Sequence, residues 1–131
     1  KFGKNICRLK MENNLERIKE LNQKIKDFAD QRDWDQFHSP KNLSMALSAE
    51  VGKLLEIFQW LKEEETQNLS LNTLRNVEEE IGDIQIYLFR LADKLGINPI
   101  EAAEKKILIN EKKYPVDKAR GNAKKYTEFE Q

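Results

Sequence analysis

The stretch that decides the fold is NTLRNVEEEIGDIQIYLFRLADKLG, residues 72–96. Its large apolar side chains recur at alternating spacings of three and four residues, which places them on one face of an α-helix. They are Leu74, Val77, Ile81, Ile84, Leu88, Leu91 and Leu95. The pattern predicts a helix over about 72–95, which Gly96 ends.

Three other segments of the chain have the same amphipathic periodicity, and they predict helices over about 14–32, 40–61 and 98–114. Capping signals mark their starts: Asn13, Ser39-Pro40 and Asn98-Pro99. The loop 33–39, the polar linker 63–68 and the tail 116–131 are expected to be irregular. Because no segment alternates as a strand does, the predicted fold class is all-α, a four-helix bundle.

The composition excludes several classes of protein. The chain has 131 residues, enough for one domain, and equal numbers of basic and acidic residues, 23 of each. A surface that is basic throughout, as in many nucleic-acid binders, is therefore excluded. No apolar run approaches the ~20 residues that span a bilayer. The single cysteine, Cys7, cannot form an internal disulfide, so we expect a reducing, cytoplasmic environment.

The first ten residues differ from the rest because they have no clear periodicity. We expect Met11 to be the natural start, with residues 1–10 as an added or disordered arm. The alternative is a short native arm. Residues 11–131 are then expected to form a single all-α domain with a basic C-terminal tail.

The second and third predicted helices repeat each other. A shift of 30 residues brings EVGK, residues 50–53, onto EIGD, residues 80–83. Each copy has a glycine inside a helix at a cost of ~1 kcal/mol relative to alanine, which close helix approach would offset. Beside each apolar seam runs a second stripe of side chains: Glu50, Lys53, Ile57 and Trp60 on one helix, and Glu80, Asp83, Tyr87 and Arg90 on the other.

If these two helices pack side by side, the carboxylates of Glu50, Glu80 and Asp83 converge. Facing helices with acidic pairs at this spacing are how helical bundles build metal sites, and Mg²⁺ prefers oxygen ligands. The alternative is that these acids belong to solvated helix faces, which is common in a chain with 35% charged residues.

Five segments together resemble the MazG-like all-α nucleoside triphosphate pyrophosphohydrolases, closest to the dCTP pyrophosphatase branch. They are WDQFH (34–38), EVGKLLEIFQW (50–60), EIGDIQIYL (80–88) and the tail segments KKYPV (112–116) and RGNAKKYT (120–127). The resemblance implies Mg²⁺-dependent hydrolysis of (deoxy)nucleoside triphosphates to the monophosphate and pyrophosphate, in nucleotide-pool house-cleaning. It also implies a homo-oligomer, either a dimer or a tetramer, with no membrane or stable nucleic-acid partner.

The resemblance implies the metal ligands Glu50, Glu80 and Asp83, with a fourth ligand at residue 53. The family has glutamate at that position, whereas this chain has Lys53. This lysine is either a substitution in an otherwise active enzyme or a natural variant with altered metal use. In both cases we predict weak activity or none. A carboxylate such as Glu79, or the family's glutamate at position 53, would orient the attacking water.

The substrate would contact two further groups of residues. Base stacking is assigned to Trp34, Phe37, Trp60 and Tyr87, with His38 as a further contact. Pyrophosphate binding is assigned to the basic residues Lys112, Arg120, Lys124 and Lys125. Core packing and a solvated basic tail are the alternatives for these residues. Two alternatives to the enzymatic function also stay open: a non-catalytic helical interaction module and a nucleic-acid-binding protein.

Overall fold

The computed structural model describes residues 2–129, and it describes the side chains of residue 13 and residues 15–129. Its elements are α1 (Phe2–Asp30), η1 (Asp35–Phe37), α2 (Pro40–Phe58), η2 (Glu63–Gln67), α3 (Leu71–Lys94), α4 (Pro99–Lys113), α5 (Val116–Ala119) and η3 (Tyr126–Glu128). Every element in this part of the chain is helical, which confirms the predicted all-α class. Within the same range, no helix is both long enough and apolar enough to cross a membrane.

Side-chain caps determine where the middle helices begin. Ser39 Oγ accepts the N–H of Asn42 at 3.1 Å, and Pro40 is the first residue of α2. Asn98 Oδ1 accepts two N–H groups at the start of α4, from Ile100 at 3.0 Å and Glu101 at 3.2 Å. These two predicted starts are confirmed. Both satisfy donors that the first turn of a helix leaves unpaired.

The predictions for the start of the first helix and for the segments expected to be irregular are wrong. Helix α1 begins at Phe2, so Asn13 is not its cap and the first ten residues, except the undescribed Lys1, are not irregular. The loop 33–39, the linker and the tail also contain short helical turns, which are η1, η2, α5 and η3. Local carboxylates stabilise two of these turns, because Glu65 accepts the N–H of Lys62 at 2.6 Å and Glu128 that of Lys125 at 2.7 Å. Such a turn needs only a few residues, and an apolar periodicity cannot reveal it.

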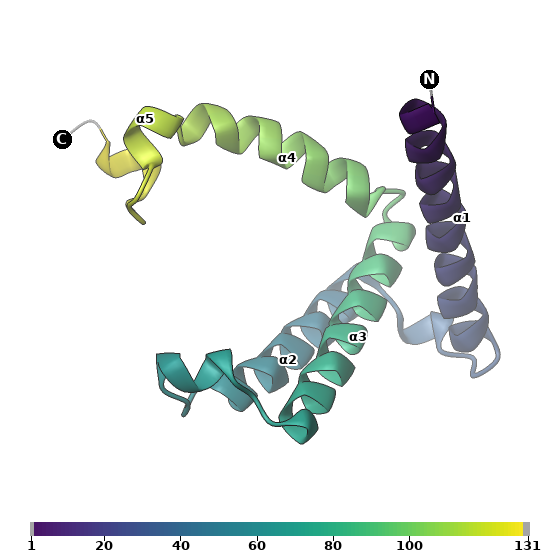
Figure 1. Ribbon diagram of the computed structural model, residues 1–131. Helices are drawn as coiled ribbons and strands as arrows, with labels where there is room; N and C mark the ends of the chain where they lie inside the picture. The colour runs from purple at the N-terminus through teal and green to yellow at the C-terminus, as the bar shows by residue number, and fades with distance from the viewer. Residues whose placement is uncertain (1, 130–131) are drawn as a thin grey trace. The chain divides into compact units, whose positions relative to one another are not determined.

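The chain divides into two compact units, residues 1–96 and 97–131, where the sequence predicts a single domain over 11–131. Gly96 has φ +65°, a left-handed conformation that ends α3 at this boundary. In the first unit α2 and α3 lie side by side and antiparallel, and α1 packs against α3 (Figure 1). The core between them is small: Ile25, Ala29, Leu43, Phe89 and Ala92 are buried.

Much of the predicted apolar seam remains accessible to solvent. Val51, Ile81 and Leu88 are 48%, 44% and 42% exposed. A methyl group added at Gly52 or Gly82 would meet no atom within 4 Å. The predicted close approach of helices at these glycines is therefore wrong within the described chain, because no neighbouring element of the chain reaches them.

The second unit contains α4, α5 and η3. Tyr114 at the end of α4 packs edge-on against Tyr126 and Phe129, with ring centroids 6.0 and 5.9 Å apart. The ammonium of Lys113 lies 5.0 Å from the centroid of the Tyr126 ring. These aromatic contacts fold the tail back onto its own helix, so the tail is more ordered than its polar sequence suggests.

Candidate functional site

Three carboxylates meet on the α2–α3 pair. Glu50 comes from the middle of α2, and Glu80 and Asp83 come from the middle of α3. One carboxylate oxygen of each lies within 4.8 Å of the others. The convergence expected from the repeated sequence is present, because the antiparallel pair brings the two midpoints opposite each other (Figure 1).

Two of the carboxylate oxygens in this cluster are buried and accept no hydrogen bond from the protein, Glu50 Oε2 and Glu80 Oε2. Burial raises the pKa of Glu80, and the neighbouring carboxylates of Glu50 and Asp83 raise it further. The Lys53 ammonium opposes this shift. A buried carboxylate oxygen with no donor is costly, so this arrangement favours binding a cation.

Lys53 already supplies one positive charge to the cluster. Its Nζ donates to Glu50 Oε1 at 3.2 Å and lies 2.9 Å from Oε2, with an orientation that makes no hydrogen bond to Oε2. The hydrogen bond to Glu50, and the charges of Glu50, Glu80 and Asp83, raise the pKa of Lys53. The Lys53 side chain is 53% exposed, whereas that of Glu50 is 13% exposed. The lysine therefore covers the outer side of the cluster.

The residues present fit a hard divalent cation. Neighbouring oxygen ligands of an octahedral Mg²⁺ are about 3 Å apart and opposite ones about 4.2 Å, so three oxygens that all lie within 4.8 Å of one another can close on the ion by side-chain rotation. Three carboxylates against one ammonium leave the cluster negatively charged. Glu79 is exposed and is not among the three clustered acids.

The side chains predicted to hold a base have different exposures. Trp60 follows α2 and is 85% exposed, while Phe37 is 58% exposed and Trp34 is 43% exposed. Trp34 packs edge-on against Phe28 of α1, with centroids 5.7 Å apart. Tyr87 is partly buried on α3. None of the four is a buried core residue, so all retain surface on which a base could stack.

Sequence reasoning missed the role of one charged residue, Arg90, which is only 3% exposed. Its guanidinium bonds Asp35 at 2.7 Å and His38 Nδ1 at 3.3 Å, so His38 has a protein partner as well as its predicted substrate role. Lys94 also pairs with Asp35. The available signal was an arginine between Phe89 and Leu91, at a point where the helix is otherwise apolar.

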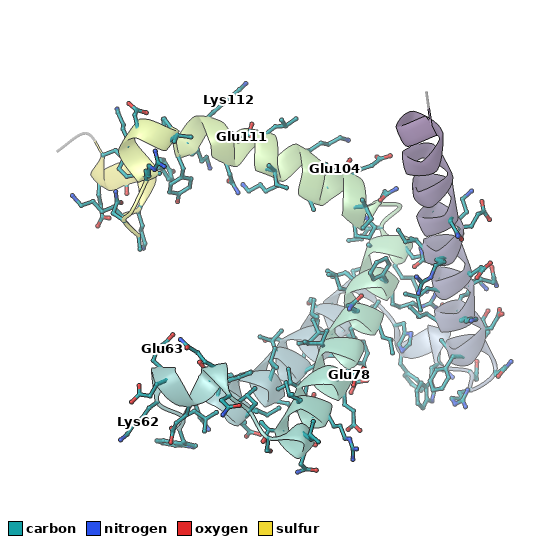
Figure 2. The ribbon with its side chains drawn as sticks, in the orientation of Figure 1. Lys62, Glu63, Glu78, Glu104, Glu111 and Lys112 are labelled. Carbon is teal, nitrogen blue, oxygen red and sulfur yellow. The ribbon has the colours of Figure 1, made fainter. Side chains whose placement is uncertain are left out.

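The basic residues assigned to pyrophosphate lie in the second unit and are exposed: Lys112, Arg120, Lys124 and Lys125. Figure 2 shows the side chain of Lys112 extending away from the end of α4. Asn122 Oδ1 accepts the backbone N–H of Lys124 at 3.1 Å, which fixes the turn before η3. The four side chains remain candidates for binding phosphate.

Comparisons with known proteins identify the family. Residues 45–129 match the MazG-like family. The chain is 43% identical over 120 residues to dCTP pyrophosphatase 1 from Bos taurus, which covers 90% of this chain and 69% of that protein. The chain belongs to the MazG-like family. The human dCTP pyrophosphatase 1 is also similar to this MazG-like chain, 41% identical over 120 residues, with the same coverage of both proteins.

A solved structure supports the same relationship. It is a pyrophosphatase from Archaeoglobus fulgidus, 44% identical, with a TM-score of 0.67 over 76% of this MazG-like chain and 93% of the archaeal one. The family and the hydrolase class predicted from the sequence are therefore confirmed.

Proposed function

We propose that this MazG-like chain hydrolyses deoxynucleoside triphosphates, dCTP-like substrates above all, to the monophosphate and pyrophosphate. The observation that carries the proposal is the cluster of Glu50, Glu80 and Asp83. Two of its oxygens, Glu80 Oε2 and Glu50 Oε2, are buried and accept no hydrogen bond from the protein, although Glu50 Oε2 lies 2.9 Å from the Lys53 ammonium. The similarity to proteins named dCTP pyrophosphatase 1 supports the choice of substrate.

We infer that Mg²⁺ is the metal, because the donors are all carboxylate oxygens. When bound, it would neutralise phosphate oxygens and polarise a water. Glu50, Glu80 and Asp83 would hold it, and Glu79 remains the candidate to orient the water. The base would stack on the aromatic side chains of Trp34, Phe37, Trp60 and Tyr87, and His38 would also contact the substrate. The departing pyrophosphate would be bound by the basic side chains of Lys112, Arg120, Lys124 and Lys125.

Lys53 is proposed to impair this chain. Its ammonium is already paired with Glu50, so a metal must displace it or bind beside it. The expected result is slow pyrophosphate release, which Lys53→Glu should raise. If the native chain and Lys53→Glu both release pyrophosphate at the same high rate, the proposed impairment by Lys53 is contradicted.

The test of the activity is a pyrophosphate-release assay with a panel of deoxynucleoside triphosphates and Mg²⁺. It compares the native chain, Lys53→Glu, and Lys53→Glu combined with Glu80→Gln. The matched control is Lys53→Glu with Glu78→Gln, because Glu78 is exposed and extends outward from α3 (Figure 2). We expect Glu80→Gln to abolish activity and Glu78→Gln to preserve it. If no variant releases pyrophosphate, the chain is a non-catalytic helical module.

We further infer that the protein is a homo-oligomer, a dimer or a tetramer. Support comes from the exposed apolar seam of the first unit, which includes Val51, Ile81 and Leu88. A face of this kind on a single chain is typical of a protein–protein contact. Sedimentation equilibrium should give a mass two or four times that of the chain, and a monomer at micromolar concentration would contradict it. A cytoplasmic location stays a prediction from the single cysteine.

A further inference from the structure

Arg90 is the buried cation among the described side chains of the first unit, and its guanidinium has three partners. One terminal nitrogen bonds Asp35 Oδ1 at 2.7 Å, and Nε bonds His38 Nδ1 at 3.3 Å. The other terminal nitrogen lies 3.8 Å from Asp93 Oδ2. Because a buried guanidinium without partners is strongly unfavourable, these contacts hold the segment around η1 against α3. The contacts with Asp35 and His38 join residues more than 50 positions apart in the sequence.

The contact with His38 determines which ring nitrogen bears the proton. An arginine Nε–H can only donate, and the guanidinium does not lose its proton in proteins. His38 Nδ1 must therefore be an acceptor, so the neutral ring has its proton on Nε2. Among the side chains that the structure describes, none bonds Nε2, and this atom is not one of the buried polar atoms without a partner. The Nε2–H group is therefore at least partly accessible to solvent and has no partner among the described side chains.

Charge and burial favour the same form of the ring. Burial lowers the pKa of His38, and the positive charges of Arg90 and Lys94 on α3 lower it further. Asp35 on η1 opposes the shift, but its carboxylate is shared with both cations. His38 is thus kept neutral under conditions where a free histidine begins to titrate.

We propose that Arg90 is a positioning residue that fixes His38 as an Nε2–H donor toward an oxygen acceptor of the substrate. The acceptor is a carbonyl oxygen of the base or a phosphate oxygen, since both accept from an N–H group. This inference rests on the proposed function, because the same segment carries Trp34 and Phe37, the candidate base contacts. His38 then recognises the substrate by hydrogen bonding and not by charge.

The first experiment needs no nucleotide and no activity. His38 is the single histidine of the chain, so long-range proton–nitrogen NMR spectra of the full chain contain one imidazole. We expect a neutral Nε2–H tautomer at pH 7 in the native chain. Arg90→Lys retains a charge for Asp35 but has no Nε–H at this position, so we expect a mixture of tautomers and an upward shift of the His38 pKa. A native ring that is protonated on Nδ1 would overturn the proposal even if Arg90 variants fail to fold.

The second experiment measures binding of a non-hydrolysable dCTP analogue with Mg²⁺ to the full chain by calorimetry. Arg90→Lys and His38→Ala should each weaken binding by about tenfold, the usual order for one lost hydrogen bond to a charged or well-positioned group. The matched control is Arg75→Lys, an exposed arginine on the same helix, which should bind as the native chain does. Equal binding by all four proteins would overturn the positioning role. The NMR result separates this outcome from a failure of the proposed function, because it is independent of any substrate.

Discussion

Replacing Lys53 should make the acidic cluster bind a metal ion more tightly, by an amount that grows with each unit of positive charge removed. Its Nζ lies 2.9 Å from Glu50 Oε2. A ligated Mg²⁺ lies about 2.1 Å from its oxygen, so a metal held by that oxygen is at most about 5 Å from the ammonium. The lysine therefore acts on the metal at short range, although its own side chain is half exposed.

The size of each step follows from Coulomb's law. In water, a unit charge about 5 Å from a divalent cation interacts with it by about three times the thermal energy. Screening by physiological salt reduces this by roughly half, so one unit of charge changes the affinity about 5- to 15-fold. Lys53→Gln removes one positive charge, and Lys53→Glu changes the charge by two units and adds a ligand. We expect metal binding about tenfold tighter in the first variant and about a hundredfold tighter or more in the second.

Calorimetric titration with Mg²⁺ and with Mn²⁺, without nucleotide, measures these affinities. The matched control is Lys41→Gln, an exposed lysine about 14 Å before Glu50 along α2. It lies beyond the screening length, so its effect should be within twofold. The gain in metal affinity of both Lys53 variants should become smaller as the salt concentration is raised. Equal affinities for native, Lys53→Gln and Lys53→Glu proteins, or an equal gain in the control, would refute the reasoning.

Three further predictions concern the stability of the fold. Leu43→Ala should lower the free energy of unfolding in urea by about 2–4 kcal/mol, because Leu43 is 1% exposed, while Leu55→Ala, at a site 61% exposed, should cost much less. Gly82→Ala should raise it by up to ~1 kcal/mol, since the added methyl meets open space; a loss instead would indicate a second copy packed there. Because the folded chain lowers the pKa of His38 below 6.5, the unfolded chain binds more protons at acid pH. Stability should therefore fall as the pH drops below about 6.5, and His38→Gln should flatten this dependence; an unchanged slope would contradict it.

The apolar periodicity was sufficient to predict the helices of the middle of the chain. Alternating three- and four-residue spacings match one face of an α-helix and no other regular structure. A serine or asparagine before a proline caps the first turn and so favours a helix start at that point. The starts of α2 and α4 are predicted for this reason. The start of α1 is not, because the regular apolar spacing begins only at Leu15, whereas the helix already includes the residues from Phe2 onward.

The acidic cluster was predicted in part. The repeat of Glu50 with Glu80 and Asp83 indicates where acids lie on each helix, but the sequence cannot say that α2 and α3 pair. That pairing depends on the contacts between the two packed helices, in which only part of each apolar seam is buried. The contact between Lys53 and Glu50 follows the ordinary three-residue spacing of a helix.

The sequence by itself determined the helical class, two helix caps and the positions of the acids, because these depend on spacing and on neighbours within one turn. Only the tertiary structure decided that Arg90 is buried and that it orients His38, because Asp35 and His38, to which it is hydrogen-bonded, are more than 50 residues away in the chain. The role of a charged residue among apolar residues of a helix cannot be predicted from its neighbours in the sequence. Its role is fixed by whichever distant acceptor the fold brings within hydrogen-bonding distance.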